Sequence, residues 1–188
     1  MNLLCIGDSI TYGYDAAPQN RWTYILARQT GIRICNEGVC GDTTAGMLQL
    51  MQLINLMDYD AVFVMGGSND ILLDEPLEHI KAHMQCMMQQ VTDKGKPLFI
   101  GIPPLTKRES AFFGWQRRDD VERHNTVLQI YRQWLLAQCP LYGAVPIDFY
   151  KRILDAEAAG TTPCYADGIH PNEAGYAIMA DEAAQRIQ

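Results

Sequence analysis

Near its start the chain reads Leu3-Leu4-Cys5-Ile6-Gly7-Asp8-Ser9, four apolar residues followed by glycine, aspartate and serine. A short, continuous apolar run that stops at a glycine is typical of a strand buried on both faces. Glycine lets the backbone turn sharply where the strand ends. This stretch therefore predicts a buried strand with a serine hydroxyl presented just beyond it.

Similar apolar runs recur along the chain and alternate with longer segments of helical periodicity. The predicted strands are Leu3–Ile6, Ile32–Asn36, Ala61–Met65, Leu98–Ile102 and Ala144–Ile147. The predicted helices are Arg21–Gln29, Thr43–Met57, Pro76–Thr92, Arg118–Ala137 and Asn172–Ile187. Such alternation predicts an α/β fold with a parallel sheet covered by helices on both faces.

Four glycine- and polar-rich segments follow predicted strands or precede the last helix. They are Gly7–Gly13, Asn36–Thr44, Gly66–Asp70 and Asp167–Asn172. Because ligands of open parallel sheets bind outside the carboxyl ends of the strands, we expect these segments to meet at one edge. Asp8 and Asp70 within them are interpreted as local hydrogen-bonding turn residues.

The segment Asp167-Gly168-Ile169-His170 carries the most chemical information. A serine that attacks an acyl group needs a base to take its proton, and that base needs a carboxylate to orient it. An aspartate and a histidine three residues apart in a turn can meet through the carboxylate and Nδ1. Alone, each residue would be read as a turn or cap residue; together with Ser9, the set favours nucleophilic catalysis.

These residues resemble the conserved blocks of the SGNH hydrolases, the GDSL-type esterases and lipases. The first block is matched by Gly7-Asp8-Ser9, with Ile10 where leucine is commonest, and the second by Gly41. The third is matched by Gly67–Asp70 and the fourth by Asp167–His170. The resemblance spans nearly the whole chain and implies a flavodoxin-like three-layer α/β/α sandwich around a five-stranded parallel sheet.

The resemblance also implies a role for each matched residue. Ser9 would be the nucleophile, His170 its general base and Asp167 the group that holds the imidazole. The backbone N–H groups of Ser9 and Gly41 and the side-chain amide of Asn69 would form the oxyanion hole. No metal and no organic cofactor is expected for such a reaction, which passes through an acyl-enzyme intermediate.

The polar and aromatic segment Leu105–Asp120 follows the fourth predicted strand. Long loops in compact domains are often functional. One hypothesis is that Phe112, Phe113 and Trp115 wall a substrate pocket. The alternative is a packing element with a solvated run of charges, and the sequence favours neither.

The overall composition narrows the class of partner. Fifteen Lys and Arg residues against 22 Asp and Glu give a net charge of −7, which argues against a nucleic-acid surface. The sequence shows no secretory signal and no apolar run long enough for stable membrane insertion. We therefore expect a single domain over residues 1–188, cytoplasmic, acting on a small-molecule ester; the oligomeric state is not indicated.

Several functions fit these observations. The leading prediction is a serine esterase for a short acyl chain, with acyl esterase, lysophospholipase or thioesterase, and carbohydrate deacetylase all open, as is acyl transfer. A non-catalytic module that binds a saccharide or lipid on the same fold is the alternative. A flavodoxin-like nucleotide binder is disfavoured because no Gly-x-Gly-x-x-Gly or Walker-type phosphate loop is present.

Overall fold

The computed structural model describes residues 1–160 and 163–187 and contains the five predicted strands in one parallel sheet. The spatial order is β2-β1-β3-β4-β5. The strands are β1 (Asn2–Gly7), β2 (Arg33–Gly38), β3 (Ala61–Met65), β4 (Leu98–Gly101) and β5 (Val145–Ile147). The five-stranded parallel α/β fold is thus confirmed, with strand ends within two residues of those predicted.

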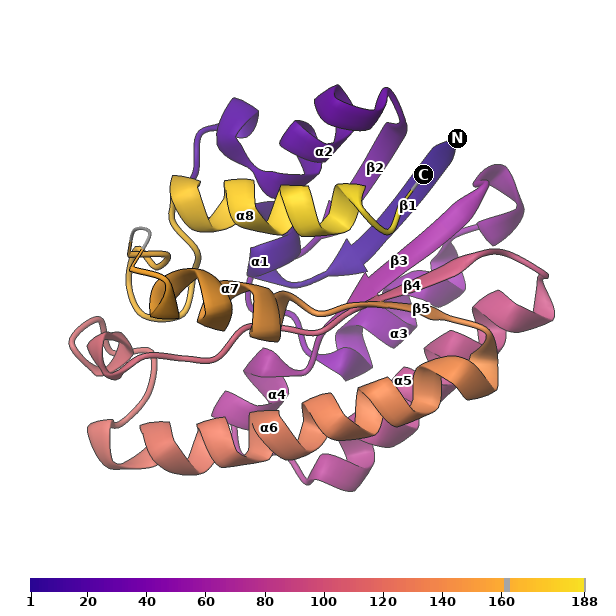
Figure 1. Ribbon diagram of the computed structural model, residues 1–188. Coiled ribbons are helices and arrows are strands. Elements are labelled where there is room, and N and C mark those ends of the chain that lie inside the picture. The colour runs from indigo at the N-terminus through magenta and orange to yellow at the C-terminus, as the bar shows by residue number, and fades with distance from the viewer. Residues whose placement is uncertain (161–162, 188) are drawn as a thin grey trace.

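Helices cover both faces of this sheet and complete a three-layer sandwich (Figure 1). The helices are α1 (Ser9–Tyr12), α2 (Trp22–Thr30), α3 (Thr44–Leu53), α4 (Ser68–Leu72), α5 (Leu77–Asp93), α6 (Val121–Gln138), α7 (Phe149–Ala158) and α8 (Glu173–Ala184). The third helix ends four residues before its predicted limit, because Ile54 is extended and Asn55 caps a separate 3-10 turn.

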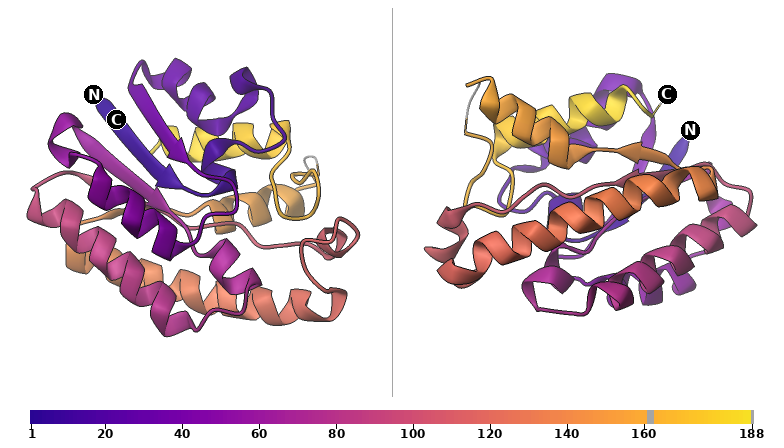
Figure 2. Two further views of the ribbon diagram at one scale, coloured as in Figure 1. Left: turned by 180° about the vertical axis from the view of Figure 1, so that it is seen from behind. Right: turned by 60° about the horizontal axis from the view of Figure 1, so that its bottom comes forward.

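The side chains of alternate residues in the central strands pack into two separate apolar cores, one on each face of the sheet. Leu4 and Ile6 of β1 pack with α3, α5 and α6, whereas Leu3 and Cys5 pack with α2, α7 and α8. The yellow α8 and the magenta α5 accordingly lie on opposite sides of the sheet when the molecule is seen from behind (Figure 2). Burial on both faces explains why β1 and β3 read as uninterrupted apolar runs.

The segments that follow the strands gather at one edge of the sheet, at the left in Figure 1. The loop after β4 and the turn before α8 come together there. Their backbones are joined by a hydrogen bond from Lys107 N–H to Gly168 C=O of 2.7 Å. This is the edge at which the sequence predicts the functional residues. Across residues 1–160 and 163–187, every helix is too short or too polar to cross a membrane.

Candidate active site

Ser9 lies where β1 passes into the short helix α1, and local contacts fix that turn. Asp8 caps α1 by accepting a 2.9 Å hydrogen bond from the Ile10 N–H. A Cβ at Gly7 would lie 2.1 Å from Thr11 Oγ1 and 2.7 Å from Met65 C=O, so only glycine fits. The buried Ser9 hydroxyl is consequently held 2.9 Å from His170 Nε2, 161 residues later in the chain.

The turn before α8 brings Asp167 against the other nitrogen of the same imidazole. Asp167 Oδ2 lies 2.7 Å from His170 Nδ1, and Oδ1 accepts the backbone N–H groups of Ile169 and His170 at 3.0 and 2.8 Å. Gly168 adopts φ +84°, and a Cβ there would lie 2.4 Å from Ser110 N. Close approach of the turn to the loop after β4 therefore requires this glycine.

Two opposing effects act on the Asp167 carboxyl. Burial by itself would raise its pKa, but the hydrogen bonds from the His170 side chain and from the backbone N–H groups of His170 and Ile169 outweigh it. The net effect is a pKa below the usual value for aspartate. Asp167 is thus a carboxylate at neutral pH and can orient the imidazole.

The three residues predicted as oxyanion donors all line one cavity with His170. Ser9 is the first residue of α1, so its N–H has no carbonyl partner within the helix. Gly41 has φ +80°, in the left-handed region that glycine adopts without strain. Asn69 Nδ2 donates a 2.8 Å hydrogen bond to Asp42 C=O, which orients the amide and leaves its second N–H for another acceptor.

Asp70 has a longer-range role than the local turn role expected from the sequence. Its carboxylate accepts the Thr44 N–H at 3.0 and 3.1 Å and the Thr44 hydroxyl at 2.6 Å. These bonds tie the start of α3 to α4. Since Gly41 precedes α3 and Asn69 belongs to α4, Asp70 fixes the spacing between two of the predicted oxyanion donors.

Asp8 is the other buried carboxyl beneath the site, and its environment disfavours a negative charge. Burial raises its pKa to about 7, and the carboxylates of Asp70 and Asp42 add to the rise, while the Ile10 N–H opposes it. Its Oδ2 atom is buried without a hydrogen-bond partner among the described residues. Asp8 is a local cap, as expected, but one that titrates near neutrality.

The cavity in front of Ser9 has a volume of about 430 Å³. Its walls are largely apolar, and Ser9 and His170 are among the residues that line it. It is lined by Ser9, Tyr14, Cys40, Gly41, Asn69, Leu72, Leu73, Trp115, Ile169 and His170. Leu72, Leu73 and Ile169 are lining residues that we did not predict; the apolar run Ile71–Leu73, directly after the Asn69-Asp70 block, was the available signal.

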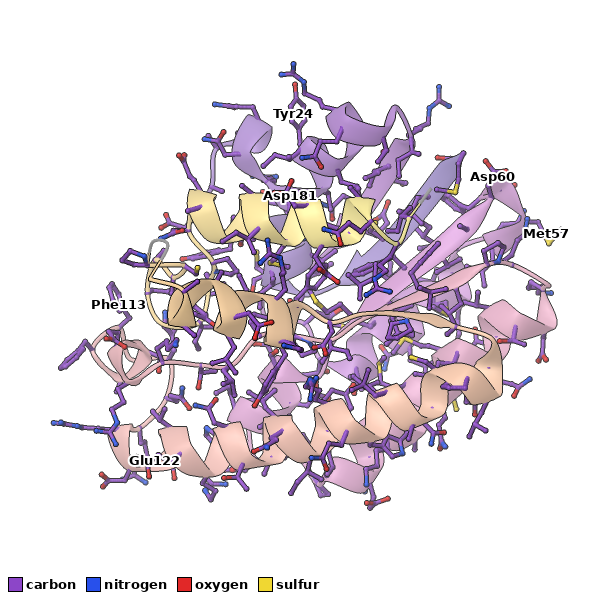
Figure 3. The ribbon with its side chains drawn as sticks, viewed as in Figure 1. Tyr24, Met57, Asp60, Phe113, Glu122 and Asp181 are labelled. Carbon is purple, nitrogen blue, oxygen red and sulfur yellow. The ribbon has the colours of Figure 1, made fainter. Side chains whose placement is uncertain are left out.

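The aromatic loop after β4 contributes one of its three aromatic residues to this cavity. Trp115 lines it, but Phe112 and Phe113 do not belong to its lining and expose 79% and 60% of their surface. The reason is local: the 3-10 turn Arg108–Ala111 and Gly114, with φ +77°, form a tip that carries both rings outward. Phe113 accordingly projects from the outer end of the loop (Figure 3).

Trp115 instead makes a contact that the sequence did not indicate. Its indole N–H donates a 2.8 Å hydrogen bond to Asp167 Oδ2, the oxygen that also faces His170. Its ring meets the imidazole edge-on at 5.3 Å between centroids, and the Tyr14 ring lies 4.3 Å from the same imidazole. Two aromatic rings therefore enclose the histidine.

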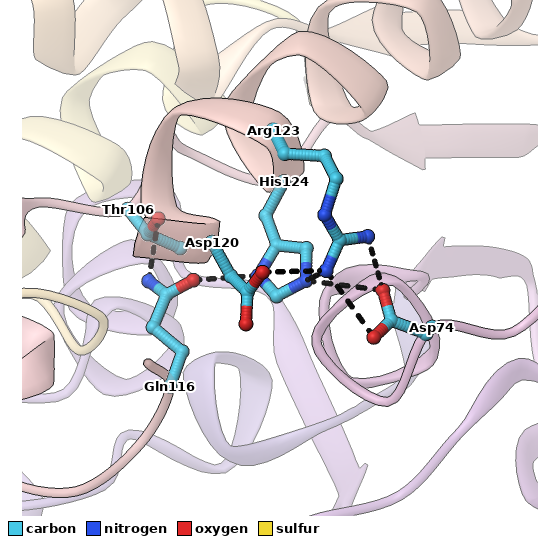
Figure 4. A network of polar contacts seen from close by, with 6 residues as sticks. All are labelled: Asp74, Thr106, Gln116, Asp120, Arg123 and His124. Atoms are coloured by element: carbon cyan, nitrogen blue, oxygen red, sulfur yellow. Dashed lines mark hydrogen bonds and ion pairs between the residues drawn. The ribbon is translucent and has the colours of Figure 1, made fainter. Parts of the chain in front are cut away.

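A polar network joins Gln116, the residue after Trp115, to Asp74, the residue after Leu73 (Figure 4). Gln116 donates to the Thr106 hydroxyl at 2.9 Å, and its carbonyl lies 2.7 Å from Nδ1 of the buried His124. His124 and Arg123 both contact Asp74, which follows the lining residue Leu73. The base of the loop is thus fixed although its tip is exposed.

The side chains of the site offer donors and a base rather than a metal-binding set. Within residues 1–160 and 163–187, no three His, Cys, Asp or Glu side chains gather in a way that could hold a metal ion. The site contains a hydroxyl, an imidazole and a carboxylate in series, beside a cavity. That series is the geometry of nucleophilic acyl transfer.

Comparison with known proteins places the chain in a family. Residues 5–178 match the GDSL-like Lipase/Acylhydrolase family. An arylesterase from Vibrio mimicus is 30% identical over 121 residues, which cover 59% of this chain and 60% of that protein. The match thus spans less than two thirds of that relative.

Solved structures show the same fold. A member of the lipolytic protein G-D-S-L family from Veillonella parvula superposes with a TM-score of 0.84 at 24% identity, covering 98% of this chain and 97% of the other. A lipase/acylhydrolase from Enterococcus faecalis gives 0.75 at 22% identity, covering 98% and 93%. From its family match, the chain belongs to the GDSL-like lipase/acylhydrolase family.

Proposed function

We propose that this protein is a serine esterase that hydrolyses a neutral carboxylic ester with a short acyl chain. Membership of the acylhydrolase family supports ester hydrolysis as the reaction. The observation that carries the mechanism is the continuous series Ser9 Oγ, His170 and Asp167, with contacts of 2.9 and 2.7 Å. A serine hydroxyl is a weak nucleophile until such a base takes its proton.

In the first half of the reaction, Ser9 Oγ attacks the carbonyl carbon of the ester while His170 Nε2 accepts the hydroxyl proton. The carbonyl oxygen becomes an oxyanion that accepts hydrogen bonds from Ser9 N–H, Gly41 N–H and Asn69 Nδ2. Collapse of this intermediate breaks the bond to the alcohol oxygen, which takes the proton back from His170. The acyl group remains on Ser9 as an ester.

In the second half, a water molecule enters in place of the alcohol. His170 takes a proton from the water as it attacks the acyl-enzyme, and the same donors stabilise the second oxyanion. Ser9 Oγ then leaves, regains its proton from His170, and the carboxylic acid is released. Asp167 stabilises the imidazolium in both halves without taking up the proton.

The cavity supports the choice of substrate. Its lining contains no Lys, Arg, Asp or Glu side chain, so nothing among these residues would neutralise a charged acyl group or headgroup. A volume of about 430 Å³ is in the range of sites for small molecules. The arylesterase name of the Vibrio mimicus relative supports an aromatic alcohol as one acceptable leaving group.

The test is hydrolysis of p-nitrophenyl acetate and of its longer-chain homologues by the parent enzyme and by Ser9→Ala. The parent should prefer the short acyl chains, and Ser9→Ala should lose activity on all of them. Thr126→Ala is the control because it removes an exposed hydroxyl from α6. Turnover by Ser9→Ala equal to that of the parent would dismiss Ser9 as the nucleophile. An inactive parent that still binds esters would favour the binding module.

A further inference from the structure

We propose that Trp115 is a positioning residue that acts on the reaction through Asp167, and not only a wall of the cavity. The inference rests on the proposed function, because it needs the series Ser9, His170 and Asp167 to be catalytic. It assigns a chemical role to the aromatic loop after β4. Trp115 would hold the carboxylate that orients the base.

The Asp167 carboxylate is held by contacts from two parts of the chain. Its carboxylate accepts two backbone N–H groups on Oδ1, while Oδ2 faces both His170 Nδ1 at 2.7 Å and Trp115 Nε1 at 2.8 Å. Three of these four groups belong to the turn that contains Asp167. The indole N–H comes from a residue 52 positions earlier and ties the turn to a separate part of the chain.

The indole N–H of Trp115 contacts Oδ2, the same carboxylate oxygen that faces the imidazole. An indole nitrogen can only donate, so it fixes the direction of the Oδ2 lone pairs without competing for the proton. The ring also meets the imidazole edge-on, at 76° between planes. Loss of the N–H would leave Oδ2 with the imidazole alone, so the carboxylate would be held by Oδ1 and by His170 but no longer fixed from the loop side. The base would then spend less time aligned with Ser9.

Hydrogen bonds at the base of the loop hold Trp115 in place. The backbone N–H of Trp115 donates to Ser110 C=O at 3.1 Å. The side-chain amide of the next residue, Gln116, donates to the hydroxyls of Thr106 and Ser110 at 2.9 and 2.7 Å. The Gln116 carbonyl is held by His124, which is almost fully buried. Trp115 is therefore anchored on both sides, although 42% of its surface is exposed.

Steady-state kinetics separate a positioning role from a purely structural one. Trp115→Phe keeps an aromatic ring beside His170 and removes the N–H. We expect kcat to fall roughly tenfold, the scale of one hydrogen bond to a charged group, while KM stays within about twofold. Trp134→Phe is the matched control, since it makes the same change on α6, where Trp134 stacks on Tyr131 away from the cavity.

A double-mutant cycle tests whether the effect passes through Asp167. In an Asp167→Asn background, Trp115→Phe should have almost no further effect on kcat, because the carboxylate it positions is gone. A tenfold loss in both backgrounds would mean that Trp115 acts on something else.

An NMR measurement tests the contact without reference to rate or yield. The chain has three tryptophans, so a ¹H–¹⁵N spectrum contains three indole N–H signals, which Trp115→Phe and Trp134→Phe assign by loss. Asp167→Asn should shift the Trp115 signal and leave the Trp134 signal in place. An unmoved Trp115 signal would show that the hydrogen bond is absent.

The outcomes distinguish this inference from the proposed function. If Ser9→Ala is inactive but Trp115→Phe has the kcat of the parent, the positioning role is wrong and the esterase assignment stands. If Trp115→Phe raises KM with kcat unchanged, Trp115 is only a wall of the cavity. If Ser9→Ala is fully active, the proposed function itself fails.

Discussion

Two regions of the molecule meet at the cavity and are built in different ways. The segments that carry Ser9, Asn69 and Asp167, which follow β1, follow β3 and precede α8, are held by caps, positive-φ glycines and hydrogen bonds. The loop between β4 and α6 reaches the cavity through Trp115 alone among its three aromatic residues, and its tip is exposed.

The difference shows how rigidity is distributed around the site. Ser9 and Asn69 lie just after strands, where the sheet fixes the start of each segment, and the turn with Asp167 and His170 is tied to the loop after β4. The loop is exposed at its tip and tied down at its base, through Trp115 to Asp167 and through Gln116 to His124. Substitutions in the first region should therefore cost far more activity than substitutions at the tip of the second.

The largest expected effect is that of removing the base. His170→Ala should lower kcat by about 10⁴-fold or more, because Ser9 then has no group to take its proton. His79→Ala is the control, since His79 is exposed on α5. Steady-state hydrolysis of p-nitrophenyl acetate measures both. A loss of less than tenfold in His170→Ala would contradict the proposed role.

The next effect concerns the amide that we assign to the oxyanion hole. Asn69→Ala should lower kcat by about 10²–10³-fold with little change in KM, because the donor acts on charge that develops during the reaction. Asn55→Ala, at an exposed turn, should match the parent in the same assay. An Asn69→Ala variant that loses affinity and keeps its kcat would place Asn69 in substrate binding instead.

A third expectation concerns the pH dependence of the protein's stability, to which the buried Asp8 beneath the site should contribute. The pKa of Asp8 is raised to about 7 in the folded protein, whereas the pKa of aspartate in the unfolded chain is about 3.9. Between these two pH values the folded protein therefore holds a proton on Asp8 that the unfolded chain releases. The parent should therefore lose stability as the pH rises from about 4 through 7. Asp8→Asn keeps the capping oxygen and removes the charge.

This variant should be more stable than the parent at pH 8, by roughly 2–4 kcal/mol, with the gain shrinking as the pH is lowered toward 4. Urea unfolding at pH 5 and pH 8 measures the difference. Asp119→Asn, which removes an exposed charge, serves as the control. A gain that is the same at both pH values would show that the Asp8 carboxyl does not titrate as described.

The smallest effect is expected at the tip of the loop. Phe112→Ala and Phe113→Ala should each leave kcat/KM within about twofold of the parent for acetate, butyrate and hexanoate esters, because neither ring lines the cavity. Unfolding free energies should change by no more than about 0.5 kcal/mol. A marked change in chain-length preference for either variant would bring the tip into the substrate site.

The sequence is informative where local chemistry and the sheet together determine the structure. Apolar runs ended by glycine located β1 and β3, and the three-residue spacing of Asp167 and His170 anticipated their contact. The helix α7 was missed, although Asp148 as a cap and the spacing of Phe149, Ile153 and Ala156 were available signals.

The loop was less predictable for a physical reason. Its conformation depends on partners far away in the sequence, such as His124 for Gln116 and Asp167 for Trp115. Aromatic composition alone cannot tell a ring that faces the cavity from one carried outward by a turn. The sequence left open whether Phe112, Phe113 and Trp115 wall a pocket or only pack, and of the three the structure places Trp115 in the cavity lining.

The central claim is that His170 activates Ser9, and covalent labelling tests it most directly. A neutral p-nitrophenyl alkylphosphonate should add one phosphonyl group per chain of the parent, on the peptide that contains Ser9, as read by mass spectrometry. Labelling should be lost in Ser9→Ala and slowed at least a hundredfold in His170→Ala. A label on another residue, or an equal rate in His170→Ala, would contradict the account.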